Sequence, residues 1–373
     1  MKKRVGISVI NDLVTDQRVQ RIAGTLDRHG FEVVLTGRIV KGSTSYNDPR
    51  FEIRRYNMLF RKGPLFYAFF NIRLFFRLMI IKRPSFFLAV DLDTLPANYL
   101  VSRLRSVPLL YDSHEYFTEV PELIGRPFVK KTWEQIERWI VPKLKHAITV
   151  STSIAKAYKK KYGTEFTVVR NVPLLHEPVS EHEINHQYPS KYKIIYQGAL
   201  NLGRGVELMI SAMQYLEDTI LIVAGDGDIT DELHAMVAEM KLREKVIFHG
   251  RVVPEELYGI TCQCNAGLSL EADMGLSYRY ALPNKIFDYI QARIPVICSD
   301  LPEMSALVND FDVGIICGER DPREVADRIR TVIEGDKGHS PGNKKIDEAA
   351  KLLCWELEEE FFLRIVEKIL DEV

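Results

Sequence analysis

The feature that most constrains the fold of this chain is an alternation of strands and helices that runs twice along its 373 residues. In the front half, short apolar runs such as RVGISVI and FEVVLTG alternate with segments of helical period, the first over Asp16–His29 and a long one over about Phe128–Lys145. The rhythm stops at residues 172–192, which contain three prolines and three histidines, and it restarts with KIIYQG. Such alternation predicts parallel, doubly wound sheets, and the length favours two domains. We therefore expect an α/β protein with two Rossmann-like domains.

The interruption sets the expected domain boundaries. Residues 1–175 are predicted to form the first domain, 176–189 a linker and 190–350 the second domain. After a hydrophilic break over 335–347, the amphipathic period of the last segment predicts a helix at about 354–373 that packs back on the first domain.

Charge is divided unevenly between the two halves. Residues 1–178 hold 30 basic against 16 acidic residues, whereas residues 179–373 hold 20 against 35. A basic front half is typical of proteins that meet nucleic acid, an anionic membrane or phosphorylated substrates. The acidic back half argues against nucleic acid as a partner.

Cysteine usage and the lack of a long apolar segment predict a cytoplasmic protein. The five cysteines are odd in number and have no zinc-site spacing, which favours a reducing compartment. VGISVI is too short for a secretory signal, and the apolar stretch 64–81 is interrupted by Arg73 and Arg77.

The aromatic and basic segment FYAFFNIRLFFRLMIIKR has two readings. It is either a docking helix for an anionic bilayer at the inner face of a membrane or a crossover helix that covers the sheet.

Ligands of doubly wound sheets bind outside the carboxyl ends of the strands. The segment GALNLGRG follows the strand KIIYQ, and its glycines would let backbone N–H groups and Arg204 approach a phosphate. A plain tight turn with an exposed arginine is the alternative.

The segment YRYALPNKIFDYIQARIPVICSD places Lys285 in the first turn of a helix predicted to begin at Pro283. The helix dipole disfavours a cation at this end. Lys285 is therefore either a solvated surface residue or the neighbour of an anion such as a phosphate. Asp288 lies close to the same helix face, where it could accept ribose hydroxyl groups.

Three further strand ends carry polar residues. His114 follows LLYDS beside Asp112 and is either an acid, base or hydroxyl-orienting group or an ordinary loop histidine. Asp91 and Asp93 form a D-x-D that either chelates a divalent cation or caps a helix. Asp226, in AGDGD, either caps a helix or binds a hydroxyl group.

The order of these pieces resembles the GT-B-fold retaining glycosyltransferases, specifically glycosyltransferase family 4. The resemblance lies in YQGALNLGRGVELMISAM, LIVAGDGD, FHGRVVPEELYGIT, LPNKIFDYIQARIPVICSD and, in the front half, YDSHEYF and VSTSIAKAYKKKYG. It implies two domains that face a central cleft. It also implies catalytic roles for His114, Arg204 and Lys285, and no metal. The nucleotide-sugar site implied by the resemblance comprises Gly198, Arg204, Asp226, Arg251, Asn284, Lys285 and Asp288.

The chain departs from the family pattern at several positions. The first of two acids that the family spaces eight residues apart is Tyr280 here, and the second is Asp288. Ala199 replaces an arginine that often follows the first glycine of the back domain, and Arg293 stands at a usual glycine. The Gly-rich loop after the first strand is NDLVTD instead.

The resemblance implies transfer of a sugar, with retention, from a nucleotide-diphosphate sugar of the UDP or GDP type to a hydroxyl acceptor. The acceptor is expected to be a saccharide or a lipid-linked sugar in bacterial cell-surface polysaccharide or glycolipid assembly. Three alternatives remain open at this point. They are a non-catalytic scaffold, prompted by Tyr280 and Ala199, a sugar-nucleotide epimerase, and a metal-dependent transferase that uses Asp91 and Asp93.

Overall fold

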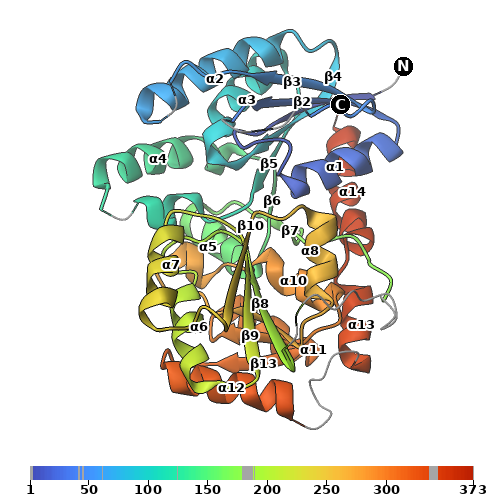
Figure 1. Ribbon diagram of the computed structural model, residues 1–373. Coiled ribbons are helices and arrows are strands. Elements are labelled where there is room, and N and C mark those ends of the chain that lie inside the picture. The colour runs from blue at the N-terminus through green and yellow to red at the C-terminus, as the bar shows by residue number, and fades with distance from the viewer. Residues whose placement is uncertain are drawn as a thin grey trace. The chain divides into compact units, whose positions relative to one another are not determined.

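A computed structural model describes residues 3–372 except 41–42, 44–45, 61, 124, 179–187, 189 and 336–342. The chain divides into two compact units. Unit 1 comprises Met1–Asn171 and Glu358–Val373, and unit 2 comprises Val172–Leu357. Each is an α/β layer structure around one parallel sheet, as the alternation of strands and helices predicts (Figure 1).

Unit 1 is built on a seven-stranded parallel sheet with the order β3-β2-β1-β4-β5-β6-β7. Its strands are β1 (Lys3–Ser8), β2 (Phe31–Arg38), β3 (Phe51–Tyr56), β4 (Pro84–Val90), β5 (Leu109–Ser113), β6 (His146–Thr149) and β7 (Thr167–Val168). The helices before the unit boundary are α1 (Gln17–Arg28), α2 (Pro64–Met79), α3 (Asp91–Arg105), α4 (Pro127–Ile140) and α5 (Thr152–Tyr162).

Unit 2 is built on a six-stranded parallel sheet with the order β10-β9-β8-β11-β12-β13. Its strands are β8 (Tyr192–Gln197), β9 (Thr219–Ala224), β10 (Val246–Gly250), β11 (Ala266–Ser269), β12 (Val296–Ser299) and β13 (Gly314–Cys317). Its helices are α6 (Val206–Ala212), α7 (Thr230–Glu239), α8 (Pro254–Thr261), α9 (Leu276–Arg279), α10 (Asn284–Gln291), α11 (Pro302–Phe311), α12 (Pro322–Glu334) and α13 (Lys344–Leu352).

Helices cover both faces of the unit 2 sheet, so its strands are buried on both sides. One core cluster joins β8, β9 and β11 to apolar residues of α6, α7 and α12. In Figure 1, α6 and α7 lie on one side of β8 and β9, and α8 and α10 lie on the other. α10 packs close to β11, because a Cβ atom on Gly267 would lie 2.2 Å from the ring of Tyr289.

Some element boundaries differ from those expected. A long helix over about 128–145 was expected, but α4 ends at Ile140 and a 3-10 turn over Val141–Lys143 follows, where Pro142 cannot continue the helical hydrogen bonds. Part of the expected break at 335–347 is helical, because α13 begins at Lys344. Most of the expected linker, residues 179–187 and 189, lies outside the described residues.

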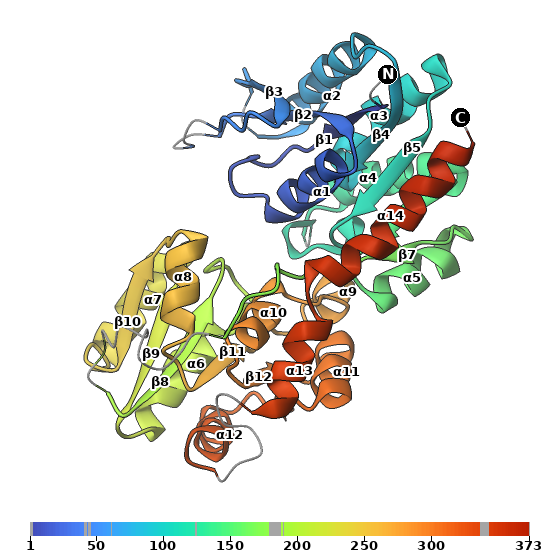
Figure 2. The ribbon, with the colours of Figure 1, turned by 90° about the vertical axis from the view of Figure 1, so that its right-hand side faces the viewer.

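The last helix, α14 (Trp355–Asp371), contains the boundary between the units. Its residues from Glu358 onward belong to unit 1, where Glu359 accepts a hydrogen bond from Thr25 and Glu358 pairs with Arg170 at 2.5 Å. Figure 2 shows α14 as the red helix that runs to the C-terminus. The chain thus passes between the units twice, once at 171–172 and once at 357–358.

Within the described part of the chain, none of the helices combines the length and apolar character needed to span a bilayer. The five cysteines, all of them described, are free thiols.

Candidate functional site

Glycines lie at the carboxyl edge of the unit 2 sheet, where the strands end. Gly198 follows β8 with a φ of 134°, and Gly225 follows β9 with a φ of 154°. A Cβ atom on Gly225 would lie 1.8 Å from the carbonyl oxygen of Gly198, so no larger residue fits there. The Gly225 N–H donates to the carbonyl of Gly250, the last residue of β10. Three neighbouring strands therefore end at or beside a glycine, and their backbones approach one another closely there.

Lys285 lies at this edge. It is the second residue of α10, which begins at Asn284 after the N-cap Pro283, one position later than expected. A Cβ atom on Gly198 would lie 3.7 Å from the Lys285 Nζ, and this Nζ lies 4.1 Å from the centroid of the Tyr196 ring. The side chain is buried and donates to the Glu271 Oε1 at 2.8 Å. Lys285 is therefore not a solvated surface residue, and the protein itself supplies one anion at this helix end.

Arg204 is the second cation of this region. It lies in the Gly-rich turn between Gly203 and Gly205, and its guanidinium carbon lies 4.8 Å from the centroid of the Tyr278 ring. Gly205 has a φ of 79°, and a Cβ atom on it would lie 1.9 Å from the Leu270 carbonyl oxygen. The turn is thus held tightly against the segment that precedes Glu271.

Asp288 is fixed by the end of β8. Its Oδ2 accepts a hydrogen bond of 2.7 Å from the Gln197 amide, whose own oxygen accepts from Thr261 at 3.0 Å. Asp288, Lys285 and Gly198 are thereby brought to the same strand end.

The other predicted residues of unit 2 lie nearer the surface. Asp226 and Arg251 follow β9 and β10 and form an ion pair of 3.3 Å in which both side chains are largely exposed. Asp226 also accepts from the Gly227 N–H and the Thr230 hydroxyl, so it stabilises its own turn. Asn284, the first residue of α10, is exposed.

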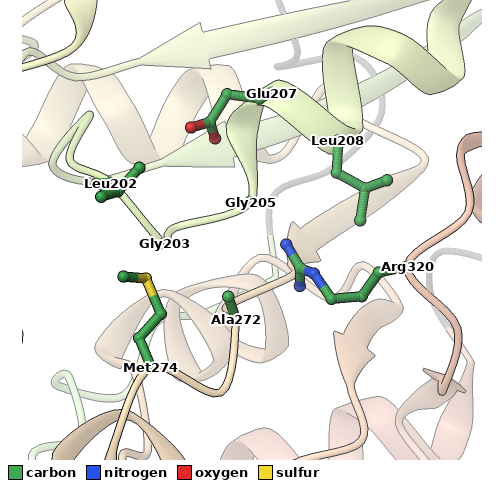
Figure 3. Close-up of a pocket in the computed structure, with 8 residues that line it drawn as sticks. All are labelled: Leu202, Gly203, Gly205, Glu207, Leu208, Ala272, Met274 and Arg320. Carbon is green, nitrogen blue, oxygen red and sulfur yellow. The ribbon is translucent and has the colours of Figure 1, made fainter.

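A cavity of about 310 Å³ flanks this region (Figure 3). It lies between the Gly-rich turn and the segment after β11, and Arg320 reaches across it. Arg320 donates to the carbonyl oxygens of Leu270 and Glu271. The residues that line the cavity are Leu202, Gly203, Gly205, Glu207, Leu208, Ala272, Met274 and Arg320. None of the predicted site residues is among them, so the cavity borders the predicted site without containing it.

His114 belongs to unit 1, where it follows β5. Its Nε2 lies 3.0 Å from the Asp112 Oδ2, and its Nδ1 lies 3.8 Å from the Asp91 Oδ2. The backbone N–H of His114 also donates to Asp91. Asp112 in turn accepts two hydrogen bonds of 2.9 Å from the buried guanidinium of Arg18. Arg18, Asp112 and His114 therefore form a buried row of alternating positive and negative groups that ends at His114.

This arrangement controls the charge of His114. Burial alone would lower the pKa of the imidazole, but the carboxylates of Asp112 and Asp91 outweigh it and raise the pKa from 6.5 to about 9. Burial raises the pKa of Asp91 to about 6. Burial also opposes ionisation of Asp112, but Arg18 and His114 hold the pKa of that carboxyl below its usual value. His114 is thus a cation at neutral pH.

Asp91 and Asp93 are both buried in the first turn of α3. Asp91 begins α3 with a φ of 57°, a left-handed conformation that aspartate tolerates better than most residues. Asp93 is buried, and burial raises its pKa well above the usual value. Within the described ranges, no group of three or more His, Cys, Asp or Glu side chains could hold a metal ion.

Two family models match the chain in succession. Residues 16–173 match the model described as "Glycosyltransferase Family 4", and residues 180–352 match "Glycosyl transferases group 1". The chain belongs to the GT-B glycosyltransferases. Both domains of this family are thus present in the order that the sequence resemblance predicted.

Two relatives named as glycosyltransferases are distant in sequence. The chain is 24% identical to the chitobiosyldiphosphodolichol beta-mannosyltransferase of Candida albicans, over 62% of this chain and 56% of that protein. It is 22% identical to the alpha-D-kanosaminyltransferase of Streptomyces kanamyceticus, over 63% of this chain and 64% of that protein. The chain thus spans less than two-thirds of the length of either relative.

Solved structures share the fold over the whole chain. Sucrose-phosphate synthase from Thermosynechococcus elongatus has a TM-score of 0.82 at 15% identity, with all of both chains covered. HepE from Anabaena, solved in complex with UDP-glucose, has a TM-score of 0.73 at 14% identity, with 99% of this chain and 100% of that chain covered. These likenesses confirm the GT-B fold.

Sequence reasoning missed the partners that hold the predicted residues. Glu271, which pairs with Lys285, comes two residues after β11, and Gln197, which holds Asp288, is the last residue of β8. Their positions at strand ends were the available signal. Arg18 lies far from Asp112 in sequence, and neither residue type nor spacing connects the two.

Proposed function

We propose that this protein transfers a sugar from a nucleotide-diphosphate sugar to a hydroxyl acceptor. The observation that carries the proposal is the placement of Lys285 beside the glycine-opened end of β8, with Arg204 in the turn that follows. Backbone N–H groups, a helix N-terminus and two cations are the groups that proteins use to bind phosphates. Asp288, held by Gln197, is the proposed acceptor for the ribose hydroxyl groups.

Departure of the nucleoside diphosphate builds negative charge on the leaving oxygens. Arg204, Lys285 and the first N–H groups of α10 are proposed to stabilise this charge, as preorganised donors do in other enzymes. The role proposed for His114 is to donate a hydrogen bond to the transferred sugar, because its raised pKa keeps it protonated. A UDP or GDP sugar is the proposed donor, and the UDP-glucose in the HepE structure supports the UDP type. Retention at the anomeric carbon follows the family resemblance.

Replacement of the two cations tests the proposal. Removal of one such donor costs about 2.7–4 kcal/mol, so Lys285→Ala and Arg204→Ala should each lower the transfer rate on the order of a hundredfold or more. Arg328→Ala removes an exposed helix arginine and should leave the rate unchanged. Near-normal turnover in either cation variant would contradict the proposed role.

A thermal-shift screen against UDP, GDP, ADP and CMP sugars identifies the donor. At least one donor should raise the melting temperature, and a screen without any shift would contradict the function itself. A donor that binds but is never transferred or hydrolysed across an acceptor panel would instead indicate a non-catalytic scaffold.

The acceptor is proposed to lie on a membrane, because α2 has two apolar faces. Phe66, Phe70, Leu74 and Leu78 pack into unit 1, as a crossover helix requires. Leu65, Ile72, Phe76 and Met79 remain exposed, and the exposed Lys62, Arg77 and Lys82 lie on the same helix or beside it. Apolar side chains among basic ones are typical of surfaces that bind anionic bilayers. The names of the Candida albicans relative and of a Campylobacter jejuni relative include the lipids dolichol and undecaprenol.

Liposome flotation measures this contact. The protein should float with vesicles that contain an anionic lipid and remain at the bottom with zwitterionic vesicles. Ile72→Ser with Phe76→Ser should abolish flotation, whereas Leu352→Ser, an equally exposed apolar residue of unit 2, should not. Flotation of the double variant at the wild-type level would exclude α2 as the docking surface.

A further inference from the structure

Lys285 occupies a position that disfavours a cation for two reasons. It lies in the first turn of α10, where the helix dipole is positive, and its side chain is only 8% exposed. A buried charge of this kind persists only with a partner of opposite charge. Whatever pairs with Lys285 is therefore part of the site.

Glu271 is that partner, and the fold holds it in place. Its Oε1 accepts from Lys285 and its Oε2 accepts from the Ser269 hydroxyl, each at 2.8 Å. Its backbone carbonyl accepts from Ser299 at 2.8 Å and from Arg320 at 3.2 Å. Burial favours the neutral acid, but Lys285 and Arg204 outweigh it and lower the pKa of this carboxyl, so Glu271 is ionised.

The same ammonium also borders the proposed phosphate site. A Cβ atom on Gly198 would lie 3.7 Å from the Lys285 Nζ, and Gly198 itself is exposed. A phosphate beside the Gly198 turn would therefore reach Lys285 while the fixed carboxylate remains close to it. Two anions would then compete for one cation.

We propose that Glu271 is a positioning residue that competes with the donor diphosphate for Lys285. This inference rests on the proposed function of the site. Without ligand, Glu271 accepts the hydrogen bond of Lys285 and holds the ammonium beside the Gly198 turn. When the diphosphate binds, Lys285 shifts its hydrogen bonds toward the phosphate oxygens, and repulsion from Glu271 limits the affinity. After transfer, Glu271 re-forms its pair with Lys285 and so favours release of the nucleoside diphosphate product.

Glu271→Gln separates this role from a structural one. Glutamine has nearly the same shape and can still accept from Lys285, but it does not repel a phosphate. The variant should bind the nucleoside diphosphate roughly tenfold more tightly than the wild type by calorimetry, because a nearby unit charge has been removed. Binding of the nucleoside without phosphates should be unchanged. Under multiple turnover, KM and kcat should fall together as product release slows.

Glu207→Gln is the matched control, because Glu207 lies in the first turn of α6, after the Gly-rich turn, and lines the neighbouring cavity. It should change diphosphate affinity by less than twofold. Weaker or unchanged diphosphate binding by Glu271→Gln would overturn the proposal, as would equal tightening in both variants. Failure of the wild type to bind any nucleoside diphosphate would instead contradict the proposed function, so the two failures are distinguishable.

Discussion

In unit 1 a single carboxylate, Asp112, is shared by two cations, Arg18 and His114, whereas in unit 2 the carboxylate of Glu271 has one direct cationic partner, Lys285. Arg18 holds Asp112 through two parallel hydrogen bonds, and both side chains are almost completely inaccessible. Lys285 makes one hydrogen bond to Glu271 and borders the exposed turn at Gly198.

This difference indicates that Arg18–Asp112 is a fixed support, whereas Lys285–Glu271 is a pair that can exchange its partner for a ligand. A bidentate arginine–carboxylate pair has one favourable geometry, in which two guanidinium N–H groups donate to the two carboxylate oxygens. A lysine ammonium can rotate its donors toward another acceptor at lower cost. We therefore expect the charges of unit 1 to fix the protonation of His114, and those of unit 2 to respond to the ligand.

The largest expected effect is on stability in unit 1. Asp112→Asn leaves Arg18 buried without its counter-ion, which costs about 3–5 kcal/mol for pairs of this kind. Urea unfolding of the variant measures this loss. Asp273→Asn is the control, since it removes a pair with Arg279 that is half exposed and should cost less than about 1 kcal/mol. Equal losses in the two variants would show that Asp112 is not a fixed support.

The second effect is the stability cost in unit 2. Glu271→Gln should lower the free energy of unfolding by only about 1–3 kcal/mol, because the glutamine oxygen still accepts from Lys285. Saturating nucleoside diphosphate should restore more stability to this variant than to the wild type. A loss as large as that of Asp112→Asn, with no recovery by ligand, would remove the distinction between the two clusters.

The third effect is a pH dependence that arises in unit 1. The pKa of folded His114 is raised to about 9, above its ordinary 6.5. The contribution of the His114 charge to the free energy of unfolding is therefore complete below pH 6.5 and is lost as the pH rises through about 9. If the transfer needs this cation, the rate should fall to about half near pH 9 and to roughly a tenth at pH 10.

Asp91→Asn provides the variant for this pH profile. Asparagine tolerates the left-handed backbone at this position, and the substitution removes one of the anions that raise the pKa of His114. The midpoint of the rate profile should move to lower pH. An unmoved midpoint would exclude His114 as the titrating group.

The smallest effect concerns Arg293, a buried cation that belongs to neither cluster. It has a φ of 61°, and its guanidinium binds Asp347 at 3.0 Å and the His176 carbonyl at 2.9 Å. Arg293→Ala loses these contacts and keeps the backbone strain, whereas Arg293→Gly loses the contacts and relieves the strain. The glycine variant should be more stable than the alanine variant by about 1 kcal/mol in thermal unfolding. Equal stabilities would mean that the left-handed conformation carries no cost.

The sequence was sufficient for the architecture because periodicity is local. Asp16 precedes the helical period of α1 and its side chain accepts from the Val19 N–H, as an N-cap residue does. The short apolar runs were likewise recognisable from their local pattern, and they form buried parallel strands. The predicted helix over about Phe128–Lys145 is longer than α4, because Pro142 ends the helical hydrogen bonding after Ile140.

Part of the site was predictable for a similar reason, since residues that end neighbouring parallel strands meet at one edge. Gly198, which follows β8, lies beside Lys285 and Asp288 of α10, the helix between the neighbouring strands β11 and β12. The partner of Lys285 was not predicted, because Glu271 lies fourteen residues earlier and only the packing of α10 on β11 brings them together. The left-handed backbone of Arg293 would suit glycine, the residue that the family resemblance implies at this position.

The passage of α14 from unit 2 into unit 1 has a consequence for synthesis. Thr25 and Arg170 bond to Glu359 and Glu358, which the ribosome makes only after all of unit 2. At roughly 5–20 residues per second, the strands of unit 1 wait on the order of tens of seconds for the helix that completes them. Most of unit 1 is thus synthesised first, but its fold is completed last. During that interval the surface of unit 1 that α14 covers in the folded protein remains exposed on the nascent chain.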